Sequence, residues 1–187
     1  MLIPMEVIGV RVEMPSNQPI VLLKEIDGTR FLPIWVGAVE ATAIAFAQQG
    51  INPDRPLTHD LMRDLLETLD ATLLAVQITH LRDGVFFATL QLRTHEDAAL
   101  AVSARPSDAI ALALRSQSNI LASRELVDQV GIEIPERLIQ EMDADGQPIE
   151  APSADLEAFR EFLDQINPED CAGEVSTSSG GVVRVGH

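Results

Sequence analysis

Residues 31–61 join an apolar strand pattern to a helix with almost no polar face, and this combination restricts the possible fold most. Gly37 ends the strand pattern and allows a sharp turn into a helix over 38–49. The interior of that helix, 41–47, is nearly all apolar and rich in alanine. A helix that is apolar all round is buried, and small side chains let its neighbours approach closely. We therefore predict that this helix is buried in the core and ends at Gly50.

Alternating apolar and charged residues precede this helix. In 5–14 the valines alternate with charged side chains, which is typical of a half-buried strand, and Gly9 allows a bulge. Asp27-Gly28 is a hairpin turn signal. The pattern predicts an antiparallel meander of three strands, at 5–14, 20–26 and 30–36.

Strands and helices then follow in clusters. A helix is expected from Thr58 to about Leu69, because Leu61, Leu65, Leu66 and Leu69 have helical spacing. Further strands are expected at 71–81, 85–92, 98–103 and 120–122, and helices at 107–116 and 125–130. Such clustering favours an α+β fold, in which a mixed, largely antiparallel sheet packs with the buried alanine-rich helix and shorter helices.

The chain changes character after residue 133. Residues 1–133 hold 10 Lys/Arg and 17 Asp/Glu, whereas 134–187 hold 3 and 12. We interpret 1–133 as one domain and 134–187 as an acidic C-terminal extension. The extension is predicted to contain one amphipathic helix at about 153–166 and a disordered tail.

Several classes of protein are disfavoured by the sequence. The single cysteine, Cys171, excludes an intramolecular disulfide and a cysteine zinc site. The most apolar window, 31–52, contains Pro33 and Glu40 and is a poor membrane span, and the first residues lack a basic signal-peptide region. We therefore expect a cytoplasmic protein without a membrane partner. No GxGxxG or Walker motif occurs, so no nucleotide cofactor is expected.

Two short motifs share the order arginine, proline, hydroxyl residue, acid. They are Arg55-Pro56-Leu57-Thr58-His59-Asp60 and Arg105-Pro106-Ser107-Asp108. A purely structural interpretation makes Thr58 and Ser107 helix caps, with each acid in a first turn where the helix dipole favours negative charge. Because caps are common, this interpretation explains both motifs without a function.

The functional interpretation is that the helix starts converge. Asp60, Asp108 and Glu40, which lies in the first turn of its own helix, then present carboxylates to a divalent cation. Mg²⁺ or Mn²⁺ needs only a few carboxylates together with water. Such an ion activates water and clamps a phosphodiester. The net charge of −16 argues against binding of polyanions at long range, and it is the main objection to this hypothesis.

The remaining residues of the motifs complete this hypothesis. Arg55 and Arg105 are candidates for phosphate binding, because a guanidinium binds phosphate oxygens in a bidentate manner. Ser107 is placed with them as a substrate contact. His59 is the candidate proton carrier, and Asp60 and Asp108 join it as candidate catalytic residues.

Four runs of sequence together resemble one known family, the bacterial bifunctional nuclease domain. They are LPIWVGAVEATAIA, RPLTHDL, LRDGVFFATLQL and ARPSDAIALALR, in this order within about residues 1–133. The resemblance implies a compact α+β domain with a mixed sheet, a homo-oligomer with a dimer favoured, and nuclease activity on DNA and RNA. The positions that match are Glu40, Arg55, His59, Asp60, Arg105, Ser107 and Asp108.

A second interpretation belongs to another functional class. In it the chain is a non-catalytic regulatory module that binds a small ligand or a protein, and the two Arg-Pro loops only shape an interface. The strong acidity suits this alternative. Geometry separates the two. If Asp60 and Asp108 face one cleft with Arg55 or Arg105, the enzyme is favoured. If they lie far apart with their side chains directed at their own backbone amides, helix capping explains them and the metal site fails.

Overall fold

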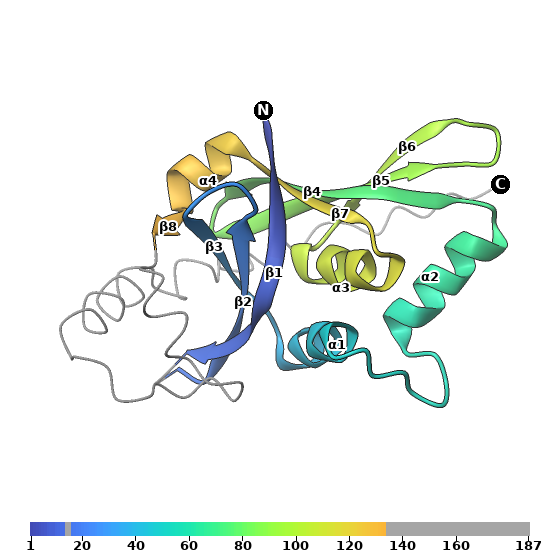
Figure 1. The fold of residues 1–187 in the computed structure, drawn as a ribbon, viewed down its shortest axis with the longest axis horizontal. Coiled ribbons are helices and arrows are strands. Elements are labelled where there is room, and N and C mark those ends of the chain that lie inside the picture. The colour runs from blue at the N-terminus through green and yellow to red at the C-terminus, as the bar shows by residue number, and fades with distance from the viewer. Residues whose placement is uncertain (14–15, 134–187) are drawn as a thin grey trace, which may run out of the picture.

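The computed structural model describes residues 1–13 and 16–133. These residues form eight strands, all in one mixed sheet, and four helices (Figure 1). This arrangement confirms the predicted α+β fold class. The predicted C-terminal extension, including the helix at about 153–166 and the tail, lies outside the described residues. No helix in the described part of the chain is long and apolar enough to cross a membrane.

The first three strands form the predicted meander. β1 (Leu2–Glu13), β2 (Gln18–Glu25) and β3 (Arg30–Trp35) pair antiparallel in sequence order. The register between β1 and β2 shifts between Val7 and Gly9, as the glycine predicted. β1 begins earlier than expected, because Leu2–Met5 pair with a strand far along the chain.

The second half of the sheet is built on a hairpin. β4 (Thr72–Arg82), β5 (Val85–Arg93) and β6 (Ala99–Ala104) are successive antiparallel neighbours. β7 (Asn119–Ser123) then runs parallel to β4 and antiparallel to β1, so it joins the two halves. The full order is β6-β5-β4-β7-β1-β2-β3-β8, with the two-residue β8 (Ile132–Glu133) at one edge.

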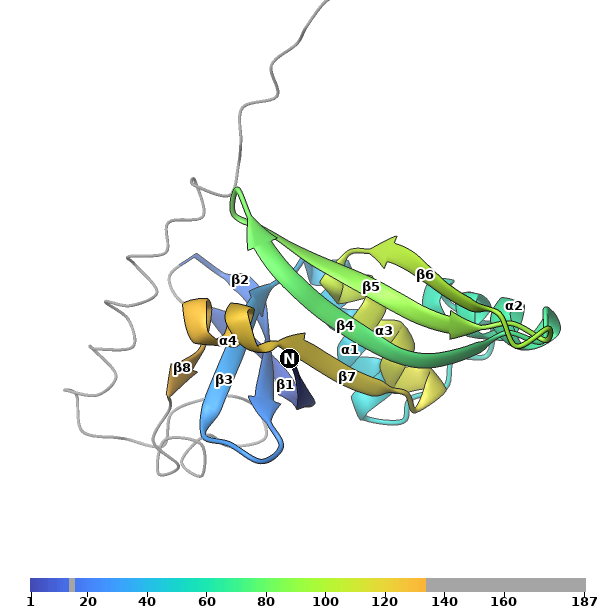
Figure 2. The same cartoon turned by 90° about the horizontal axis from the view of Figure 1, so that it is seen from above.

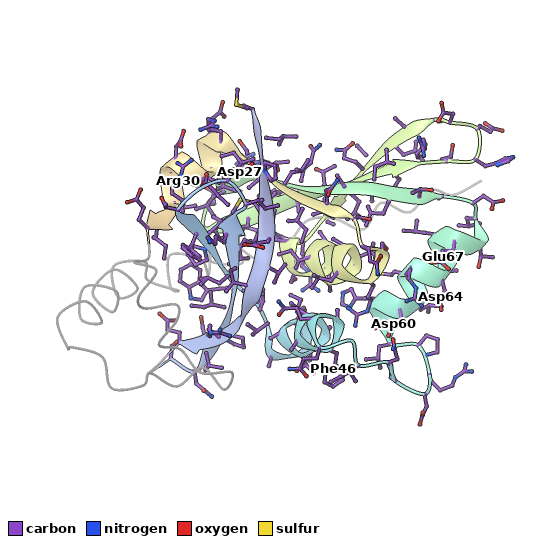
Figure 3. All side chains as sticks on the ribbon, viewed as in Figure 1. Asp27, Arg30, Phe46, Asp60, Asp64 and Glu67 are labelled. Carbon is purple, nitrogen blue, oxygen red and sulfur yellow. The ribbon has the colours of Figure 1, made fainter. Side chains whose placement is uncertain are left out.

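The central helix is α3 (Pro106–Ser116), not the alanine-rich helix. Seven of its residues are buried, and it packs against β4, β5 and β7. α1 (Ala38–Gln48) packs on α3 and on β1 and β2, and only Ala41, Ala43 and Ile44 of it are buried. The prediction of a helix buried all round was therefore wrong. α1 forms the outer layer beyond α3, and Phe46 lies on the side of α1 turned away from α3 (Figures 1 and 3).

The other two helices lie toward the ends of the sheet. α2 (Thr58–Thr68) packs on α3 through a side that includes His59, Met62 and Leu66. Leu61, Leu65 and Leu69, whose spacing predicted the helix, are exposed. α4 (Arg124–Val130) packs against β3, β4 and β7.

An ion-pair group ties α4 to the meander. Arg30 donates to Glu25 at 2.7 Å and to Asp128 of α4. Figure 3 shows Arg30 near α4, at the opposite end of the molecule from α2. Glu25 is buried, so this group holds the β2–β3 turn against α4.

Candidate functional site

Four polar side chains meet where α1, α2 and α3 begin. Arg105, just before α3, lies 2.9 Å from Glu40 of α1 through Nη2. The same guanidinium donates to Asp108 of α3, from Nε at 2.8 Å and from Nη2 at 3.1 Å. Asp108 Oδ1 lies 3.2 Å from Nε2 of His59 of α2. We call Glu40, His59, Arg105 and Asp108 the polar cluster.

Exposure decreases from one end of the polar cluster to the other. The side chain of Arg105 is 67% exposed, that of Asp108 27% and that of His59 9%. The side chain of Glu40 is 19% exposed. Arg105 is therefore the group that a molecule arriving from solvent meets first, and His59 lies behind Asp108.

Local sequence places each member. Glu40 and Asp108 are in the first turns of their helices, as predicted, and His59 is in the first turn of α2. Gly37 makes room for Glu40, because a Cβ at Gly37 would overlap the Oε2 atom of Glu40. The side chain of Glu40 thus folds back over Gly37. The first turns of three helices therefore contribute side chains to this region, and a first turn is where the helix dipole favours negative charge.

The ion pairs change the proton affinity of the polar cluster. Burial works to raise the pKa of Asp108, but the hydrogen bonds from Arg105 and His59 outweigh it and lower the pKa. The hydrogen bonds to Asp108, followed by the charge of Glu40, raise the pKa of Arg105. Asp108 is therefore ionised and Arg105 charged at neutral pH. One guanidinium faces two carboxylates.

Asp60 does not join the polar cluster. Its Oδ1 accepts from Arg115 Nε at 2.5 Å, and its Oδ2 accepts from the backbone N–H of Leu57 at 2.9 Å. Burial works to raise its pKa, but Arg115 and the Leu57 N–H lower it overall. In Figure 3 Asp60 lies at the end of α2 near α1 and α3. Its contacts fasten the start of α2 and occupy both oxygens.

Arg115 is the residue that sequence reasoning missed. Its Nη1 donates to the carbonyls of Ala43 at 3.1 Å and Ala111 at 2.9 Å, so one buried guanidinium joins α1, α2 and α3. A signal did exist: Arg115 is the basic residue in the last turn of α3, where the helix dipole favours a cation. Its distant partners were not visible in the sequence.

The two hydroxyl residues of the motifs do not cap their helices. α2 begins at Thr58 with Leu57 as N-cap, and α3 begins at Pro106 with Arg105 as N-cap, and neither has a side-chain cap. The expectation that Thr58 and Ser107 are caps was wrong by one and two positions. α2 begins at Thr58 itself, as predicted, and α3 begins at Pro106, one residue before the predicted start. Ser107 is buried in the first turn of α3.

Arg55 stays apart from the polar cluster. It is exposed on the loop that connects α1 to α2, and within residues 1–13 and 16–133 it forms no ion pair. The two Arg-Pro motifs are therefore not equivalent. The second places its arginine in the polar cluster, and the first contributes His59.

The described residues contain no group of three or more His, Cys, Asp or Glu arranged to hold a metal ion. Of the three predicted ligands, Glu40 and Asp108 share Arg105, while Asp60 is engaged by Arg115 and Leu57. A site with three carboxylates does not fit this arrangement. Two carboxylates with open water positions are enough for Mg²⁺ when substrate phosphates complete its shell.

Comparison with known proteins gives one family model, described as the bifunctional nuclease domain, which matches residues 21–135. An uncharacterized protein of Mycobacterium tuberculosis (strain H37Rv) is 46% identical over 165 residues, which are 88% of this chain and 94% of the relative. Bifunctional nuclease 2 of Arabidopsis thaliana is 27% identical over 154 residues, 81% of this chain and 44% of the relative. Bifunctional nuclease 1 of Oryza sativa subsp. indica is 25% identical over 117 residues, 61% of this chain and 35% of the relative.

Proposed function

This chain belongs to the bifunctional nuclease domain family, and from that membership we propose that it hydrolyses phosphodiester bonds of DNA, RNA or both. The printed names of the plant relatives support the activity at the level of the family. The polar cluster supports the location of the reaction. The observation that carries the proposal is Arg105, an exposed guanidinium between two carboxylates at the meeting point of three helix starts.

Arg105 takes the role of phosphate ligand. A guanidinium binds two phosphate oxygens with parallel hydrogen bonds, and 67% exposure leaves Arg105 accessible. Helix N-termini favour anions, and three of them adjoin the polar cluster. The net charge of −16 belongs to the whole chain, and salt screens its distant charges, so Arg105 and the helix starts act on a phosphate at short range. Arg55 and Ser107 are second candidates for substrate contact.

Asp108 and Glu40 take the role of orienting the attacking water. The lowered pKa of Asp108 keeps it ionised, which suits a group that accepts hydrogen bonds from water or binds a cation. His59 is a positioning residue, because it lies behind Asp108 and reaches the reaction through it. The sequence suggested a catalytic role for Asp60. We instead assign Asp60 a structural role, in which it holds the start of α2 in position.

A divalent cation, Mg²⁺ or Mn²⁺, is part of the proposal. Glu40 and Asp108 are the residues that would hold it, with water and substrate oxygens as further ligands. When bound, such a cation lowers the pKa of water and neutralises charge on the phosphate. Arg105 pairs with the same two carboxylates, so a cation held by them would take over negative charge that Arg105 now neutralises. The proposal includes no nucleotide cofactor.

The alternative is a non-catalytic binding module. One observation favours it: in the polar cluster both carboxylates are paired with Arg105, so the ion pairs alone can explain why these residues hold three helices together. Under this alternative the same surface binds a ligand or a protein without bond cleavage. The two proposals differ in whether the polar cluster turns over a substrate.

A cleavage time course separates them. Labelled single-stranded DNA and RNA are incubated with purified full-length protein, with and without Mg²⁺ or Mn²⁺. A Glu40→Gln, Asp108→Asn double variant is compared with Glu67→Gln, which removes an exposed carboxylate of α2. We expect metal-dependent cleavage that falls about 100-fold or more in the double variant only. Binding without cleavage in the wild type would favour the module.

Two further parts of the proposal concern assembly and place. The resemblance to the family supports a homo-oligomer, with a dimer favoured. A cytoplasmic location remains the expectation from the sequence. Both are tested independently of cleavage, by the mass of the purified protein in solution and by cell fractionation.

A further inference from the structure

The edge strand β6 is unusual for a free edge. It comprises Ala99–Ala104, and its sequence ALAVSA contains no charged residue and no proline. It forms the end of the sheet, with β5 as its one neighbour among the described strands. Leu100 is 48% and Val102 44% exposed. Proteins usually protect an edge strand with charges, proline, a bulge or a short length, so an uncharged apolar edge requires a cover.

The opposite edge of the sheet provides a contrast. There the terminal strand is β8, which pairs with β3 through only two residues. A strand this short offers little to an incoming strand. β8 covers only Arg30 and Phe31, and the rest of β3 contains Pro33, which protects an edge. β6 has no such protection and no strand on its outer side among the described residues.

We propose that β6 pairs with β6 of a second copy of this chain, antiparallel about a two-fold axis. Residues directly opposite each other in an antiparallel pair point to the same face of the sheet. An odd-numbered residue must therefore lie opposite an odd-numbered one, and an even-numbered residue opposite an even-numbered one, for the two sheets to continue each other. Centred on Ala101, this register places Leu100 of one copy opposite Val102 of the other. Both side chains lie on the face of Leu90 and Leu92, because β5 pairs Leu90 with Val102 and Leu92 with Leu100.

Charge selects a second copy as the occupant. Two chains with net charge −16 repel each other, so they associate best through a face that carries no charge. β6 is such a face. Because β6 has no positively charged side chain, it does not attract nucleic acid. Because it has no charged side chain of either sign, it forms no ion pairs with a charged protein partner.

A second exposed apolar surface belongs to α2. The leucines Leu57, Leu61, Leu65 and Leu69 follow one another at intervals of four along and beside α2, and all four are exposed. Figures 1 and 2 place α2 at the end of the molecule where β5 turns into β6. A stable interface buries roughly 800 Å² per partner, from about 20–30 residues. β6 alone has six residues, so an interface of that size also needs exposed residues beside the strand.

The proposed interface is adjacent to the polar cluster in sequence. β6 ends at Ala104, and the next residue is Arg105. Pairing of β6 therefore fixes the strand that delivers Arg105. The inference concerns assembly, and it stands whether the polar cluster is a nuclease site or a binding site.

The test is the mass of the full-length chain in solution, by sedimentation or light scattering. We expect a dimer, twice the chain mass of 20.3 kDa, in the wild type. A Leu100→Glu, Val102→Glu variant is expected to be monomeric, since it adds like charge to the proposed contact. The matched control is Ile26→Glu, Val85→Glu, which changes two apolar residues that are 55% and 50% exposed outside β6. It should stay dimeric.

A cysteine variant tests the register and does not require a disrupted strand. In a Cys171→Ser background, Ala101→Cys places two thiols opposite each other at the two-fold axis. Diamide should oxidise them to an intermolecular disulfide faster than in an Ile26→Cys control. Three results overturn the proposal: a monomeric wild type, a folded Leu100→Glu, Val102→Glu variant that remains dimeric, or cross-linking no faster at position 101 than at position 26.

Discussion

Arg115 near the end of α3 donates to Asp60 at the start of α2 across 2.5 Å, with both side chains largely withdrawn from solvent. The same guanidinium bonds backbone carbonyls of α1 and α3. This contact fixes the position of α2, and α2 carries His59. The geometry of the polar cluster thus depends on a residue outside it.

Replacement of Arg115 should cost much stability. Arg115→Met leaves Asp60 as a poorly solvated carboxylate without its partner, so we expect the free energy of unfolding to fall by about 3 kcal/mol. Arg63→Met, which breaks the more exposed pair with Asp64 on α2, should cost no more than about 1 kcal/mol. Denaturant titration of both variants measures the difference. Equal losses would show that the Arg115 contact adds nothing beyond a surface pair.

Stability should also depend on pH through Asp60 and Asp108. Folding lowers the pKa of both groups below the ordinary 3.8. Between the folded and the ordinary pKa the unfolded chain binds more protons, so stability rises with pH there. The contribution is complete above about pH 5 and is lost as the pH falls through the folded pKa. We expect the melting temperature of Asp60→Asn to fall less than that of the wild type from pH 6 to pH 3. Parallel pH profiles would rule out a lowered pKa at Asp60.

Two glycine substitutions should separate the polar cluster from overall stability. Gly37→Ala has an allowed backbone (φ −71°), but its Cβ must displace the Glu40 carboxylate, so activity should fall more than stability. Gly50→Ala has free space but a φ of +66°, so it should lose roughly 1 kcal/mol of stability and keep its activity per folded molecule. Chemical denaturation and cleavage rates are measured on both. Identical behaviour of the two variants would contradict the role of Gly37.

Removal of residues 143–187 should leave a folded domain. All the packing described for the sheet and helices lies within 1–133, and the family model ends at residue 135. We expect the shortened chain to unfold cooperatively, with a melting temperature close to that of the full chain. Thermal unfolding followed by circular dichroism checks this. A broad, non-cooperative transition would mean that the C-terminal extension belongs to the core.

Local elements were predictable from sequence, and their arrangement was not. Alternation and the Asp27-Gly28 turn predicted the meander, because strand faces and tight turns are set by neighbouring residues. The place of β7 between β4 and β1 depends on pairing between distant segments, which no local pattern contains. Hydropathy likewise showed that α1 is apolar. It did not show that α3 lies between α1 and much of the sheet and takes the buried position.

The polar cluster was partly predictable for the same reason. Glu40, Arg105 and Asp108 were recognised because each stands at a helix start, and the structure brings them together with His59. Asp60 had the same local signature, yet its partner is Arg115, which is 55 residues away in the chain. Equivalent positions in two similar motifs therefore acquired different surroundings. Only tertiary packing distinguishes them.

The most direct test of the proposed nuclease site is the cleavage rate of Arg105→Gln against Arg124→Gln. Arg124 is an exposed arginine at the start of α4, a helix outside the polar cluster, so its variant matches the change in charge. With labelled single-stranded DNA and saturating Mg²⁺ or Mn²⁺, we expect Arg105→Gln to lower kcat/KM about 100-fold or more. Arg124→Gln should stay within about threefold of the wild type, a change of under 1 kcal/mol in transition-state free energy. Equal rates for the two folded variants would contradict a phosphodiesterase site at the polar cluster.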